Sequence, residues 1–240
     1  MVLRKKALPL PPDLTIACGG VDIRPSATAR YLGLIIDQHL TFEDQVNHVC
    51  TSVYKKIGAF RRCRRTVDHT TKRIFYLSLI QSTIEYASNS YAHCLTPSLY
   101  SRLVTLSHIS MKQVFGLPRR TPTVFVLRHA KLYSLESRLN LRLFIFVFRC
   151  IHQLTSPLLS SMFTLQSAAT CTERRTRGQS FSSLSLPAAT TRYGMFSISF
   201  LGADRWNSLP VSCRQVEHLS VFVSLCKEHL GFPVTRRQRL

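Results

Sequence analysis

The residues of this chain that could carry chemistry begin with its carboxylates, because clustered acids hold the divalent metals of polymerases, nucleases and many phosphoryl-transfer enzymes. Only 12 Asp and Glu are spread over 240 positions, and the one adjacent pair is Glu43-Asp44. Both acids fall in the first turn of an expected helix, where complementing the helix dipole is the preferred interpretation. Asp37 ends an expected strand, and we assign it a turn-forming role. The sequence therefore predicts no catalytic residue and no cofactor in this chain.

Cysteines and histidines offer a second possible chemistry, a zinc site. The one plausible set is Cys213, His218, Cys226 and His229, whose spacing matches no standard zinc finger, although Cys226 and His229 could share a helix face. A structural role is the preferred interpretation, and zinc binding stays open. Because the eight cysteines include no Cys-x-x-Cys pair, we expect reduced, mostly buried thiols of an intracellular protein.

Basic side chains are abundant. The chain has 32 Lys and Arg, a net charge of +20 and a pI near 10.3, which favours a phosphate-rich partner, nucleic acid before an anionic membrane. The candidate phosphate-binding residues are Lys55, Lys56, Arg61, Arg62, Arg64, Arg65, Lys72, Arg73, Arg119 and Arg120. The nearby Phe60, Phe75 and Tyr76 could stack on bases, although aromatic residues at helical spacing more often lie in a core.

The elements that must position these residues begin with a small predicted β-meander. Its three strands are expected over residues 14–18, 21–23 and 29–37. Gly19-Gly20, between the first two strands, tolerates the positive φ of a tight hairpin turn. A further short strand is expected at Phe196–Phe200, where apolar and polar residues alternate.

Apolar residues at helical spacing predict a run of helices with short links, which is typical of a helical bundle. The helices are expected over approximately residues 41–65, 70–87, 96–116, 121–130, 134–154, 156–163 and 219–230. Thr41 and Asp44 resemble a capping box, and Thr96 is an expected N-cap followed by proline. In the second helix we expect Ile74, Leu77, Ile80 and Ile84 in the core and the aromatic pair Phe75 and Tyr76 less completely buried.

The stretch Arg30-Tyr-Leu-Gly-Leu-Ile-Ile-Asp37, followed by Leu40-Thr-Phe42, resembles a block near the end of the reverse transcriptase domain of non-LTR (LINE-type) retrotransposons. Further stretches resemble downstream parts of these polyproteins in the same order: Gly58–Arg62, Tyr76–Ile80, Ile84–Tyr86, Val114–Pro122, Pro157–Ser160 and Gly202–Pro210. Each motif alone is weak. The resemblance rests on their collinear order, which spans the chain from about residue 1 to 230.

This resemblance implies a primer-grip hairpin holding the 3′ end of the priming strand, with roles for Tyr31, Leu32 and Gly33. The following thumb helices would hold phosphates without reading sequence. The implied partners are RNA and DNA, as an RNA–DNA hybrid, and the palm and fingers of the parent polyprotein. The family's aromatic-Ala-Asp-Asp turn and upstream metal-binding Asp are missing from this sequence. The resemblance therefore implies a truncated fragment that does not polymerise alone, with Mg²⁺ expected only for the intact parent enzyme.

We predict a mainly α fold, a helical bundle preceded by a small antiparallel β-meander, with a looser C-terminal module that holds one short strand pair and a final helix. The predicted segments are 1–40, the end of the palm; 41–163, the thumb and post-thumb bundle; 164–192, a Ser/Thr-rich linker; and 193–240, a C-terminal module with a basic tail. No membrane partner is expected, because the longest apolar run, Leu143–Phe148, is far shorter than the roughly 20 residues of a span. The expected location is the cytoplasm, the nucleus or both.

The alternative is a host-retained structural or protein-interaction module with no nucleic-acid role. Trp206 is then a candidate recognition anchor, although burial of this single tryptophan is the preferred interpretation.

Overall fold

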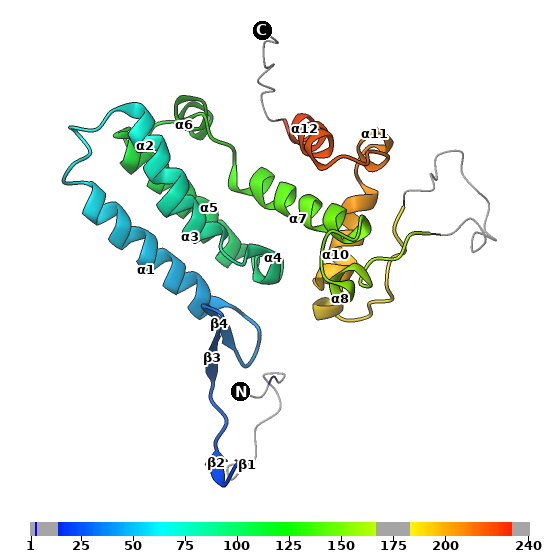
Figure 1. The fold of residues 1–240 in the computed structure, drawn as a ribbon. Helices are drawn as coiled ribbons and strands as arrows, with labels where there is room; N and C mark the ends of the chain where they lie inside the picture. The colour runs from blue at the N-terminus through cyan, green and yellow to red at the C-terminus, as the bar shows by residue number, and fades with distance from the viewer. Residues whose placement is uncertain (1–2, 4–13, 167–182, 232–240) are drawn as a thin grey trace. The chain divides into compact units, whose positions relative to one another are not determined.

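The computed structural model describes residue 3, residues 14–166 and residues 183–231, and its elements confirm the predicted fold class, mainly α with β-structure near the N-terminus (Figure 1). The chain divides into two compact units, termed here unit 1, Met1–Leu132, and unit 2, Tyr133–Leu240. Most of the predicted linker and the basic C-terminal tail lie outside the described residues.

The β-structure of unit 1 is arranged as two antiparallel hairpins. The first joins β1 (Ile16–Cys18) and β2 (Val21–Ile23), with Ile16 opposite Ile23. Its turn is the predicted Gly19-Gly20 pair, whose φ values of 59° and 81° lie in the left-handed region that glycine adopts without strain. Every residue of both strands is exposed, so this hairpin adds nothing to the core.

The second hairpin corrects the expectation of a single strand over residues 29–37. The segment folds back on itself as β3 (Thr28–Tyr31) and β4 (Leu34–Asp37), with Tyr31 opposite Leu34. Leu32 and Gly33 have φ values of 46° and 83°, as the two central residues of a type I′ turn require. The sequence signal for this turn is a single glycine, Gly33, within an otherwise apolar run, so the turn was not predicted.

Helix α1 (Glu43–Phe60) begins without the predicted capping box. Its N-cap is Phe42, in a left-handed conformation and with no side-chain cap. The buried carboxylate of Asp37 instead accepts hydrogen bonds from the backbone N–H groups of His39, Thr41 and Phe42, at 2.9, 3.1 and 2.6 Å. Asp37 therefore has the predicted turn-forming role and organises the connection from β4 into α1.

The core of unit 1 lies between α1 and α5 (Pro97–Phe115), and α6 (Thr123–Ala130) packs on α5. The apolar stripe predicted for the first helix is buried: Val46, Val49, Val53, Ile57 and Phe60. Thr96 caps α5 as predicted, because its hydroxyl accepts a hydrogen bond from Leu99 N, and the helix ends at Gly116 with φ 74°. Each buried aliphatic side chain contributes about 1.5–3 kcal/mol.

The second predicted helix of unit 1 contains a π-helical segment. It runs through α2 (His69–Phe75), η1 (Tyr76–Gln81) and α3 (Ser82–Glu85), and the short α4 (Ser88–Tyr91) follows. A π turn holds more residues than an α turn and so shifts the side that faces the core. Tyr76, Ile80 and Ile84 are buried whereas Ile74 is exposed, so the expectation for Ile74 and Tyr76 is wrong.

Unit 2 packs around α7 (Leu135–Ile151), which contacts α10 (Ile198–Asn207) and α12 (Leu219–His229). The remaining helices of unit 2 in the described ranges are α8 (Pro157–Ser160), α9 (Arg192–Met195) and α11 (Val211–Arg214). Trp206 is 1% exposed and stacks on Phe222 with ring centroids 5.5 Å apart. The preferred interpretation of Trp206 is thus confirmed, and α7 lies in unit 2 although the sequence placed it within the bundle 41–163.

The strand expected at Phe196–Phe200 is wrong. Ser197 caps α10 by accepting a hydrogen bond from Phe200 N, and the alternating residues become the first turn of that helix. The helix packs closely, because a Cβ added to Gly202 would lie 2.8 Å from Phe163 Cε1. The extended pairing that unit 2 shows in its described part is one bridge between Leu165 and Leu184.

Candidate nucleic-acid interface

The part of unit 1 from residue 45 to 132 is strongly positive. It holds fourteen Lys and Arg against two acids, Asp68 and Glu85. Glu85 is buried, and Asp68 is the N-cap of α2, accepting hydrogen bonds from Thr71 N and Thr70 N. The hydrogen bond from the Thr71 side chain, together with these backbone bonds, lowers the pKa of the Asp68 carboxyl. The acids therefore leave most of the positive charge uncompensated.

Two basic connections of unit 1 lie side by side. Residues 61–68 join α1 to α2, and residues 116–122 join α5 to α6. Arg64 links the two, because its Nη1 donates a hydrogen bond to Gln113 O at 3.0 Å. Its Nε also lies 3.9 Å from the position that a Cβ on Gly116 would take. The structure thus brings together two clusters that are about 50 residues apart in the sequence.

The second connection is held by Lys112, whose Nζ donates a hydrogen bond to Arg119 O at 2.9 Å. Five exposed arginines lie on the two connections: Arg61, Arg62, Arg65, Arg119 and Arg120. We term these five residues the basic end. Guanidinium groups present paired donors that match phosphate oxygens, so this surface is suited to a polyanion.

Lys56 and Arg64, both predicted phosphate ligands, have partners within the fold. Lys56 Nζ donates hydrogen bonds to Leu79 O, at 3.1 Å, and to the Thr83 hydroxyl. Leu79 lies in the π-helical segment η1, so this hydrogen bond joins α1 to that segment. Arg64 has the linking role described above. Among the other predicted residues of this region, Lys55 is exposed, and Lys72 and Arg73 are half-buried.

The aromatic residues considered for base stacking are wholly or partly buried. Phe60 and Phe75 stack on each other with ring centroids 4.0 Å apart. Tyr76 is fully buried, and its hydroxyl lies 3.2 Å from Ser107 Oγ. A place in the core, the preferred interpretation of these rings, is confirmed for Phe60 and Tyr76, whereas Phe75 is half-buried.

A pair of outward-facing rings on α6 was not predicted from the sequence. Phe125 and His129 lie one turn apart with planes inclined by 11° and centroids 5.9 Å apart, and both are exposed. The buried residues of α6 are Val126 and Ala130, so the positions directly before them must face outward. That four-residue spacing is the signal in the sequence that could have identified these rings.

The predicted primer-grip residues occupy the turn of the second hairpin. Tyr31 and Leu32 are 67% and 77% exposed. Tyr86 supports the turn, because its hydroxyl donates a hydrogen bond to Leu32 O at 2.5 Å and its ring lies 3.5 Å from where a Cβ on Gly33 would be. Ile35 N donates to Gln45 Oε1 at 3.0 Å, which joins β4 to the first turn of α1.

The hairpin turn and the basic end lie at opposite ends of α1 (Figure 1). The helix has 18 residues, so its axis is about 27 Å long at 1.5 Å per residue. The structure therefore does not join Tyr31, Leu32 and Gly33 with the arginines into one small site. A ligand that touches both must be long, as a nucleic-acid strand is.

The zinc set is only partly brought together. Cys213 and Cys226 are buried next to each other, whereas His218 and His229 are exposed. Burial raises the pKa of both thiols, that of Cys226 to about 12, which opposes the thiolate form that zinc requires. Within the residues that the structure describes, no group of three or more potential ligands could hold a metal ion.

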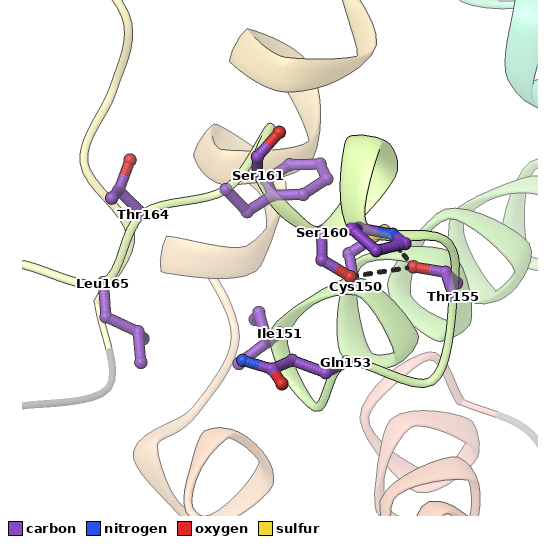
Figure 2. A pocket seen from close by; sticks show the side chains of 10 residues that line it. Cys150, Ile151, Gln153, Thr155, Ser160, Ser161, Thr164 and Leu165 are labelled. Atoms are coloured by element: carbon purple, nitrogen blue, oxygen red, sulfur yellow. Dashed lines mark hydrogen bonds between the residues drawn. The ribbon is translucent and has the colours of Figure 1, made fainter.

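Unit 2 contains a pocket of about 530 Å³ beside the end of α7 (Figure 2). In this pocket the Thr155 hydroxyl lies 3.1 Å from Ser160 Oγ. It also donates a hydrogen bond to Cys150 Sγ at 3.7 Å. Burial raises the pKa of the Cys150 thiol, which disfavours a nucleophilic thiolate. The described lining has no histidine and no charged side chain: Cys150, Ile151, Gln153, Thr155, Pro157, Ser160, Ser161, Phe163, Thr164 and Leu165. This pocket suits an uncharged group and offers no base to activate a nucleophile.

Comparisons with protein-family models, with curated proteins and with solved structures find no match to this chain. None of the helices in the described ranges combines the length and apolar character needed to cross a membrane.

Proposed function

We propose that this chain binds nucleic acid through the basic end of unit 1, holding the phosphate backbone and performing no chemistry of its own. The observation that carries this proposal is the junction of residues 61–68 with residues 116–122, which gathers five exposed arginines. Phosphate contacts of this kind position a strand without reading its sequence.

The resemblance of the chain to non-LTR retrotransposon reverse transcriptases supports the same function. In this proposal unit 1 is the thumb and post-thumb part of such an enzyme, and its ligand is an RNA–DNA hybrid, met in the cytoplasm or the nucleus. The exposed hairpin turn at Tyr31, Leu32 and Gly33 is the proposed primer grip. Its distance of about one α1 length from the arginines spans several base pairs of a duplex.

A salt titration tests the proposal. If each of the five arginines neutralises one phosphate, the logarithm of the binding constant for a hybrid duplex falls with the logarithm of salt concentration with a slope of about −4.5. Changing Arg61, Arg62 and Arg65 to Ser should make that slope shallower by about 2.7. Fluorescence anisotropy of a labelled RNA–DNA hybrid at several salt concentrations measures both values.

The matched control changes three exposed basic residues of unit 2, Arg149, Arg205 and Lys227, to Ser. This variant loses the same charge but keeps the basic end, so its slope should equal that of the unchanged protein. A flat salt response, or equal slopes for the two triple variants, would contradict the proposed site.

A second function, a protein-interaction module, is favoured by the first hairpin. Ile16, Ile23, Cys18 and Val21 pair across β1 and β2 on one face, and all four are exposed. An isolated two-stranded hairpin is marginal in water, so a partner that covers this face would stabilise it. The same titration separates the two functions, because an interaction module without a nucleic-acid role gives no salt-dependent binding to the hybrid.

A further inference from the structure

We propose that Phe125 and His129 of α6 form a stacking site for an unpaired base of nucleic acid, next to the basic end. This inference rests on the proposed function and extends it, because phosphate contacts alone do not distinguish a paired from an unpaired strand.

Phe125 is an exposed aromatic residue of α6. The His129 ring lies nearly parallel to the Phe125 ring, with centroids 5.9 Å apart, and Phe125 is 53% exposed. A phenylalanine normally gains stability by burial, so an exposed ring held parallel to a second ring is a surface available for a ligand. A base has a flat aromatic face and stacks on such a ring without regard to its identity.

His129 is fixed from behind by two other helices. The ring of His69, on α2, meets that of His129 edge-on at 5.1 Å, and His69 Nε2 lies 3.0 Å from His129 O. The ring of Phe115, the last residue of α5, also meets His129 edge-on, at 6.0 Å. These contacts hold the His129 ring in place before a ligand arrives. Binding of a base therefore requires few side chains to lose conformational freedom.

The charges around Phe125 and His129 favour a nucleic-acid strand over an apolar protein surface as the ligand. Arg128 lies on α6 between the two rings in sequence, Arg119-Arg120 precede the helix and Lys131 follows it, and all four are exposed. The nearest acid in sequence to His69 is Asp68, whose carboxylate already accepts hydrogen bonds from α2. An apolar partner would remove the cations from water without pairing them, whereas a strand supplies phosphates beside its base.

A pair of equally charged probes tests the site. One is a labelled single-stranded oligothymidylate, and the other is a strand of the same length in which abasic sugars replace the nucleotides. The unchanged protein should bind the base-bearing strand roughly 5- to 150-fold more tightly, which is the range for one stacked base. F125A and F125L should both lose this preference while keeping their affinity for the abasic strand, and F125W should keep it.

The exposed neighbour Val124 supplies the matched control, because V124A removes apolar surface from the same helix without removing a ring. V124A should behave as the unchanged protein does. Equal affinity of the unchanged protein for both strands overturns the stacking site but leaves the proposed phosphate binding intact. An F125L variant with full base preference also overturns it, because the surface would then act through apolar contact alone. Absence of binding to either strand overturns this inference together with the proposed function.

Discussion

Replacing Asp37 with Ala should destabilise unit 1, because this carboxylate organises the connection between β4 and α1. Its loss leaves the backbone N–H of Phe42, a buried donor that lies 2.6 Å from Asp37 Oδ2, without an acceptor. An unpaired buried donor costs about 1–3 kcal/mol, and the half-buried donors of His39 and Thr41 add about 1 kcal/mol after partial hydration. We expect the free energy of unfolding to fall by about 2–4 kcal/mol, a large share of the roughly 5–15 kcal/mol typical of a domain.

The effect should depend on pH. Burial by itself raises the pKa of the Asp37 carboxyl, but the hydrogen bonds from Thr41, Phe42 and His39 outweigh burial and hold that pKa below its ordinary value. A lowered folded-state pKa contributes stability that is present above the ordinary value, about 3.9, and is lost as pH falls through the folded-state value. The difference between the unchanged protein and Asp37→Ala should therefore narrow as the pH is lowered below about 4.

Guanidinium denaturation followed by far-UV circular dichroism measures the change. Trp206 lies in the core of unit 2, so its fluorescence provides a comparison within the same sample. Asp44→Ala is the matched control, since Asp44 is an exposed acid in the first turn of α1 and its removal should cost only about 0.3–1 kcal/mol. The role assigned to Asp37 is wrong if Asp37→Ala lowers the free energy of unfolding no more than Asp44→Ala does. It is also wrong if Asp37→Ala lowers the free energy of unfolding equally at pH 3 and pH 7.

Two further predictions concern unit 2 and the thiols. Gly202→Ala should lower the free energy of unfolding by about 1–3 kcal/mol, because the added Cβ would lie 2.8 Å from Phe163; an unchanged or raised denaturation midpoint, monitored by tryptophan fluorescence, would show that α10 can shift away. In the native protein Cys18 and Cys63, which are exposed, should be alkylated at pH 8 long before Cys226, whose pKa burial raises to about 12. Peptide mass spectrometry after timed alkylation measures this order, and early modification of Cys226 would contradict its burial.

Local signals in the sequence were sufficient for the regular helices. The threonine cap and glycine end of α5 are read correctly, because each acts on backbone groups within one turn. The apolar stripe of α1 is read correctly as well, because a helix that buries one face needs apolar residues every three or four positions.

The same local signals did not predict departures from regular helical or strand periodicity. A π turn inside the second helix changes which residues face the core, so Tyr76 is buried and Ile74 exposed. Five alternating residues at Phe196–Phe200 were too few to distinguish a strand from a helix start, and close packing of Gly202 on Phe163 accompanies the helix.

The sequence by itself determines that this protein is mainly helical, strongly basic and poor in paired carboxylates. Those properties follow from composition and local spacing. Only the tertiary structure decides which cations remain available, since Lys56 and Arg64 are taken up by backbone carbonyls of other helices. It also places residues 61–68 next to residues 116–122 through Arg64, and turns Phe125 outward while Phe60 turns inward. The physical reason is that packing and hydrogen bonding between distant helices satisfy some polar groups and rings and leave others at the surface.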